Sequence, residues 1–141
     1  MVIPTGAGGR RGFTLLQVTL ALQTLAIAFQ AATAGLLLST AYGETLHGVG
    51  ARVMYGASML YLLAAVLAWR PGGGPVRPVL HATGFLVLAS VQVVLGVAHQ
   101  PAPHVPLGVL MFGLSLLDLG RSRVVDHRNS AGRAGRTGHE H

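Results

Sequence analysis

The chain contains no cysteine and no lysine, and only 10% of its 141 residues carry a charged side chain. The absence of cysteine excludes disulfide bonds and thiolate metal sites, so any metal ion would need histidine, methionine or carboxylate ligands. Hydrophobic residues make up 51% of the sequence, which leaves too little polar surface for a domain that folds in water. We therefore expect the lipid bilayer to be the solvent of this chain.

Four long apolar stretches follow one another along the sequence, and short segments rich in proline and glycine separate most of them. A helix of about 20 residues crosses the roughly 30 Å hydrocarbon layer of a membrane. The proline-rich connectors cannot continue a helix. The sequence thus predicts an all-α, integral membrane four-helix bundle over residues 13–120, with spans at about 13–39, 50–69, 79–98 and 105–119.

The arginines are distributed unevenly around these spans. All but Arg52 fall on the side of the two chain termini, and the positive-inside rule places that side in the cytoplasm. We expect residues 1–12 to form a cytoplasmic N-terminal segment, residues 121–141 a disordered basic cytoplasmic tail, and residues 40–49 and 99–104 the outer loops. The net charge of +6 therefore reflects membrane topology, and nucleic acid is not an expected partner. Arginine without lysine indicates a bacterial chain, and hence the inner (plasma) membrane.

The second and fourth spans resemble each other. Residues 47–62 align with residues 104–119, and the alignment pairs His47 with His104, Met54 with Met111, Gly56 with Gly113 and Ser58 with Ser115. The first and third spans match more weakly. This pattern predicts two tandem helix-pair repeats that enter the membrane in the same orientation, related by an axis along the membrane normal.

The paired histidines are the candidate metal ligands. In each copy, helical spacing places a glycine and a methionine on the same face as the histidine. Such a groove admits a flat ligand, although small residues also serve close helix packing alone. We expect a b-type haem between two axial histidines, and the residues predicted to contact it are His47, His104, Gln30, Gln92, Gly50, Gly108, Met54 and Met111.

The other histidines of the spans are weaker candidates. His81 lies near the cytoplasmic end of the third span with no histidine opposite, so a second haem is not expected. His99 could replace His104 as a ligand, but it has no counterpart in the first copy.

Two short motifs resemble the haem A synthase family. Glu44-Thr-Leu-His47 resembles the Glu-x-x-His-Arg motif in that family's first outer loop, with Gly48 in place of the arginine. Gln92-Val-Val-Leu-Gly96, followed by His104, resembles its third and fourth helices. Most members have two four-helix halves, and this chain resembles a single half over most of residues 13–120. The resemblance implies that the two histidines are axial haem ligands and that Glu44 is the catalytic glutamate implicated in oxidising a haem methyl group.

These observations predict a haem-binding membrane protein that handles haem or transfers electrons, and they leave open whether it is an enzyme. The alternative is a cofactor-free membrane protein that acts as an accessory or assembly subunit of a larger complex. A proton-coupled transporter ranks third, because no carboxylate lies in the middle of a span. Besides the lipid bilayer, the partners considered are a second copy of the chain and a larger respiratory-type membrane complex.

Overall fold

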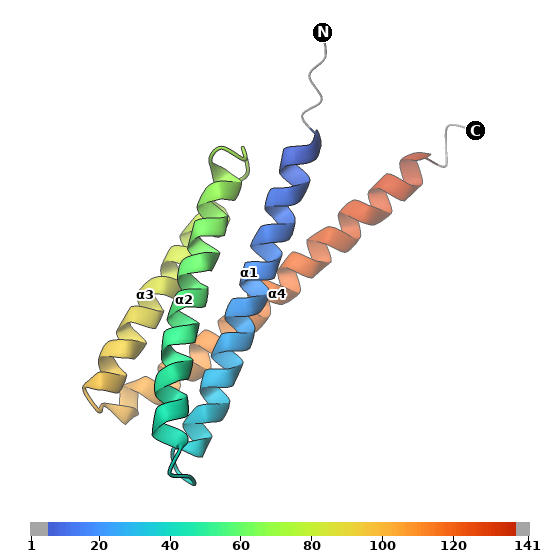
Figure 1. Cartoon of the computed structure of the whole chain (residues 1–141). Coiled ribbons are helices and arrows are strands. Elements are labelled where there is room, and N and C mark those ends of the chain that lie inside the picture. The colour runs from blue at the N-terminus through green and yellow to red at the C-terminus, as the bar shows by residue number, and fades with distance from the viewer. Residues whose placement is uncertain (1–5, 138–141) are drawn as a thin grey trace.

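The computed structural model describes the backbone of residues 6–137 and the side chains of residues 15–122. This part of the chain forms four α-helices and no strand: α1 (Gly6–Leu36), α2 (Gly43–Trp69), α3 (Arg77–Val97) and α4 (Pro101–Thr137). The helices run alternately up and down, so α1 begins and α4 ends at the same end of the bundle (Figure 1). We call this the terminal end. The opposite end, where α2 and α4 begin, is the histidine end.

Each helix packs against two neighbours. α1 and α3 both contact α2 and α4, so α2 and α4 occupy diagonal corners of the bundle. α4 also leans away from the other three helices toward its C-terminal end (Figure 1). Each helix contains a segment long and apolar enough to cross a membrane: Leu15–Leu36, Gly43–Trp69, Arg77–Val97 and Pro101–Ser122. The predicted all-α membrane four-helix bundle is confirmed, while the duplication and the cytoplasmic position of the termini stay predictions.

Small side chains fill much of the bundle interior. Ala65, Ala82 and Ala89 are completely buried, and alanine at these positions lets helix backbones approach closely. Large apolar side chains point outward instead: Leu25 is 66% exposed and Val94 65% exposed. A water-soluble monomer rarely exposes so much contiguous apolar surface, so this distribution suits helices surrounded by lipid.

All four helices begin earlier than predicted, and the difference bears on the candidate site in α2 and α4. α2 starts at Gly43 instead of Gly50, and α4 starts at Pro101 instead of Val105. Gly43 lies directly against the backbone of Leu36, where a Cβ atom would overlap the carbonyl group. Pro101 suits a first helical position, because the N–H group that proline lacks has no partner there. The predicted outer loops at 40–49 and 99–104 are therefore shorter, and both candidate histidines lie inside helices.

The C-terminal boundary also differs from the prediction. α4 does not end at Leu119 but continues to Thr137, so the predicted disordered tail 121–141 is helical up to that residue. No proline follows Pro106, and arginine and alanine, which favour helix, recur in this segment. α1 likewise begins at Gly6, within the predicted N-terminal segment 1–12. Residues 1–5 and 138–141 lie outside the described residues.

Candidate functional site

His47 and His104 meet across the diagonal of the bundle at its histidine end. His47 is the fifth residue of α2 and His104 the fourth residue of α4. The centres of the two imidazole rings are 6.2 Å apart, and the ring planes are inclined at 69°. Two helices in diagonal positions thus bring two imidazole rings close together, although the helix backbones do not pack against each other.

A backbone carbonyl group orients His104. Its Nδ1 atom lies 3.1 Å from the carbonyl oxygen of Gln92 on α3. Because a carbonyl oxygen can only accept a hydrogen bond, Nδ1 carries the proton, and Nε2 of the neutral ring keeps its lone pair. Gly96 makes room for this ring, since a Cβ atom there would come within 3.3 Å of His104 Cε1. A hydrogen bond from Nδ1 to a backbone carbonyl group is typical of a histidine that binds a metal ion through Nε2.

Side chains of α1 orient His47. Its Nδ1 atom lies 3.4 Å from Oγ1 of Thr33, whose hydroxyl group donates to the carbonyl oxygen of Gln30 at 3.0 Å. The Thr33 oxygen is therefore the acceptor of the Nδ1–H group. The other ring nitrogen, Nε2, lies 3.2 Å from Nε2 of Gln30 and accepts a hydrogen bond from that amide group. Both histidines thus have a protonated Nδ1 held by a neighbouring helix, with the lone pair on Nε2.

A cavity of about 220 Å³ lies between the helices beside the two histidines. Seven of the eight predicted cofactor contacts line it: His47, His104, Gln30, Gln92, Gly108, Met54 and Met111. The eighth, Gly50, is buried against Gln30, where a Cβ atom would overlap the Gln30 Oε1 atom. Glu44 is exposed in the first turn of α2 and does not line the cavity. The structure therefore brings together all the predicted cofactor contacts except Gly50, and it does not bring Glu44, the carboxylate suggested by family resemblance, to the cavity.

Several lining residues were not predicted. Ile27, Ala31 and Ala34 follow one face of α1, and Val105, Val109 and Phe112 lie on α4. Helical spacing from Gln30 could have identified Ile27 and Ala34, because positions three or four residues apart share a face. Val105 and Val109 are 59% and 69% exposed, and Ala31 is exposed as well. The cavity therefore opens sideways, between α1 and α4, toward the surrounding lipid.

Equivalent contacts occur in the two helix pairs. The Gln30 amide lies against Gly50, and the Gln92 amide lies against Gly108, whose Cβ would come within 2.8 Å of Gln92 Nε2. Each glycine thus provides the space that a glutamine from the preceding helix fills. Each glutamine also keeps one buried oxygen, Oε1, without a hydrogen-bond partner. Unpaired buried polar atoms are costly in a bilayer, and two of the four found among the described residues lie beside this cavity, while the other two belong to Gln23 outside its lining.

The donor set fits the axial ligands of a haem. Two metal–nitrogen bonds of about 2 Å, with about 1 Å from each nitrogen to its ring centre, separate two axial imidazoles by about 6 Å. The observed separation is 6.2 Å. The cavity is smaller than the roughly 300 to 1,000 Å³ of most cofactor sites, so the rim of a macrocycle would extend through the opening between α1 and α4. Among the described residues no group of three His, Cys, Asp or Glu could hold a metal ion, but a haem needs only two axial protein ligands.

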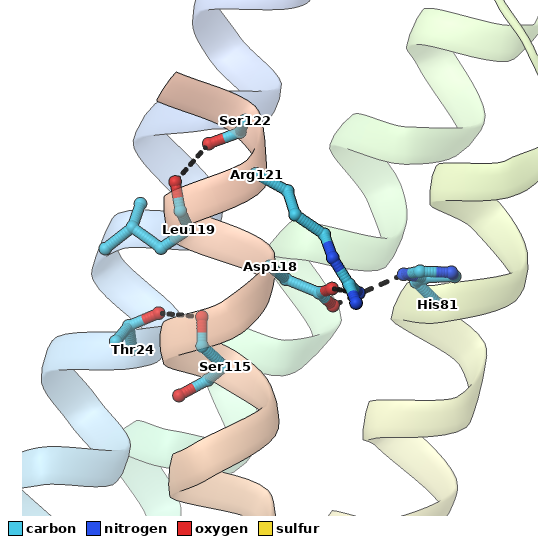
Figure 2. Close-up of polar contacts among 7 residues, drawn as sticks. All are labelled: Thr24, His81, Ser115, Asp118, Leu119, Arg121 and Ser122. Atoms are coloured by element: carbon cyan, nitrogen blue, oxygen red, sulfur yellow. Dashed lines mark hydrogen bonds and ion pairs between the residues drawn. The ribbon is translucent and has the colours of Figure 1, made fainter. Parts of the chain in front are cut away.

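A second polar cluster lies nearer the terminal end. Figure 2 shows His81 of α3 facing Asp118 of α4, with Nδ1 and Oδ2 3.3 Å apart. Arg121 approaches the other carboxylate oxygen at 3.5 Å. The His81 side chain is 52% exposed and that of Asp118 13% exposed, so this hydrogen bond links α3 to α4 at the edge of the bundle. No second histidine contacts His81 in the described part of the chain.

Comparison of the chain with protein-family models, with curated proteins and with solved structures found no match. The relationship to haem A synthases suggested by the two short motifs thus rests on those motifs alone.

Proposed function

We propose that this protein binds one b-type haem between His47 and His104 and serves in haem handling or electron transfer. The observation that carries the proposal is the separation of the two rings, 6.2 Å between centres, with each Nδ1 held by a neighbouring helix. This arrangement leaves the lone pairs of two Nε2 atoms at the same cavity. A bis-histidine haem has both axial positions filled, which suits one-electron transfer.

The residues of the chain would each contribute to this site in a definite way. Thr33 and the carbonyl group of Gln92 fix the orientation of the two imidazoles. Met54 and Met111, both buried, form the apolar floor of the cavity and exclude water from it. Because Glu44 lies outside the cavity lining, oxidation of a haem methyl group is not part of the proposal.

Absorption spectroscopy tests the proposal. Protein purified in detergent from haem-replete cells is expected to show a Soret band, which His47→Ala weakens or shifts and His104→Ala removes. His81→Ala and His99→Ala are matched controls, because neither side chain lines the cavity. A colourless wild-type protein would refute the proposal and favour the cofactor-free accessory subunit instead.

We also propose that the histidine end faces away from the cytoplasm in a bacterial inner membrane. Arg70, Arg77 and Arg121 support this orientation, since each lies where an apolar span ends on the side of the terminal end. The chain has no cysteine, so single-cysteine variants can be labelled without background. A membrane-impermeant thiol reagent applied to intact spheroplasts should label Thr40→Cys, in the connector of the histidine end, but not Pro75→Cys. The opposite pattern would reverse the assigned orientation.

A further inference from the structure

The two histidines differ in what holds Nε2, the nitrogen available to a metal. In His47, Nε2 accepts a hydrogen bond from the side-chain amide of Gln30 at 3.2 Å. In His104, the only hydrogen bond among the described residues is made by Nδ1, to the main-chain oxygen of Gln92. Nε2 of His104 is therefore free to bind a metal ion, whereas Nε2 of His47 must first lose its hydrogen bond from the Gln30 amide.

The lone pair of His47 Nε2 can serve only one partner at a time. It accepts either the N–H group of Gln30 or a metal ion, so Gln30 competes with the metal for this nitrogen. The Gln30 amide group is held beside His47, because its Oε1 atom lies against Gly50 and position 50 has no room for a larger side chain. The bond from Nδ1 to Thr33 can persist in both arrangements, since it uses the opposite side of the ring.

We propose that His47 is the exchangeable axial ligand, that His104 is the permanent one, and that Gln30 captures the His47 imidazole when it leaves. This inference rests on the proposed haem site and adds an activity to it: the site binds a neutral diatomic molecule on the His47 side. A bound haem would then exchange the His47 ligand for the diatomic molecule without transfer of an electron. The released Nε2 of His47 would accept a hydrogen bond from the side-chain amide of Gln30.

Carbon monoxide is a suitable probe, because it binds reduced haem only where an axial position can open. The haem-loaded, dithionite-reduced protein is titrated with carbon monoxide, and the Soret shift gives the affinity. The wild-type protein is expected to bind. A net hydrogen bond contributes about 1 kcal/mol, so Gln30→Ala should lower the carbon monoxide affinity about fivefold by leaving His47 without a competing partner.

Gln23→Ala is the matched control. Gln23 lies on the same helix, is completely buried, and is not among the residues that line the cavity. Its replacement should leave the carbon monoxide affinity unchanged. A second perturbation, Gly50→Ala, displaces the Gln30 amide without removing it and should shift the affinity in the same direction as Gln30→Ala.

The double variant His47→Ala with Gln30→Ala completes the test. Once His47 is absent, Gln30 has no imidazole to capture, so the double variant should bind carbon monoxide as tightly as His47→Ala alone. Equal affinities of wild type and Gln30→Ala would overturn the inference while leaving the haem site intact. So would an effect of Gln23→Ala as large as that of Gln30→Ala. Absence of a Soret band in the wild-type protein would instead refute the proposed function itself.

Discussion

The two ends of the bundle use histidine in different ways. At the histidine end, His47 and His104 face each other and are oriented by a hydroxyl, an amide and a backbone carbonyl group. Near the terminal end, His81 faces the carboxylate of Asp118. In both places a neighbouring group holds Nδ1, which leaves Nε2 on the far side of the ring. The difference is that His47 and His104 line one cavity together, whereas His81 lies outside that cavity and has no second histidine opposite it among the described residues.

The largest expected effect comes from the ligands themselves. His104→Ala should weaken haem binding more than about 100-fold, because it removes the permanent ligand. Loss of a residue that only orients a ligand usually weakens binding about 10- to 100-fold. His81→Ala should leave haem content unchanged. Haem content is measured by pyridine haemochrome in the purified proteins. If His81→Ala lost haem as readily as His104→Ala, the contrast between the two ends would be wrong.

The glycines that accommodate the cavity glutamines give the next largest effect. Gly50→Ala should lower the free energy of unfolding in detergent by about 1–3 kcal/mol, since its Cβ atom overlaps Gln30 and lies 3.3 Å from Phe29. Gly56→Ala is the control in the same helix, because no atom lies within 4 Å of its Cβ position. Equal stability of the two variants would show that the tight contact is relieved by a small shift of Gln30.

Loss of an orienting partner should be milder. Thr33→Val keeps the shape of the side chain but removes the acceptor of His47 Nδ1 and should weaken haem binding about 10-fold. Thr24→Val is its control, because the Thr24 hydroxyl lies near the carbonyl oxygens of Leu20 in its own helix and of Ser115 in α4, and Thr24 does not line the cavity (Figure 2). Haem transfer to apomyoglobin measures both affinities. A Thr33→Val protein that retained haem like Thr24→Val would show that ring orientation depends on packing alone.

The ion pair near the terminal end should contribute least. A double-mutant cycle of His81→Ala and Asp118→Ala is expected to give a coupling of about 0.2–1 kcal/mol, as for other exposed ion pairs. The His81 side chain is 52% exposed, which limits the interaction by solvent screening. Unfolding in detergent at low salt measures the coupling. A value of several kcal/mol would instead place this cluster among the structural determinants of the bundle.

The four helices could be predicted from the sequence, whereas their starting points could not. Hydrophobic length identifies a span, but α2 continues outward through Glu44 and Thr45, which are polar and exposed. These residues occupy the first turn of the helix, where a carboxylate is favoured by the free N–H groups. A prediction based on apolar residues alone therefore places the start of α2 too late in the sequence.

The candidate site was predicted in composition but not in detail. Equivalent positions in residues 47–62 and 104–119 identified the histidines and methionines that line one cavity. The distance between the rings depends on the packing of four helices, which spacing along one helix does not determine. The partner of His104 is a main-chain oxygen, and every residue has one, so no side-chain pattern indicates it. The contact of Gln30 with His47 also requires the packing of α1 against α2.

The cavity opens sideways between α1 and α4, past the exposed Val105 and Val109, and this determines how a ligand reaches it. A molecule would arrive from the hydrocarbon phase, so its partitioning into the membrane sets the concentration that the protein experiences. Affinities measured in water would then change with the amount of lipid or detergent present. Of two ligands with equal intrinsic affinity, the one more soluble in the bilayer would occupy the site to a greater extent, so the membrane would contribute to selectivity.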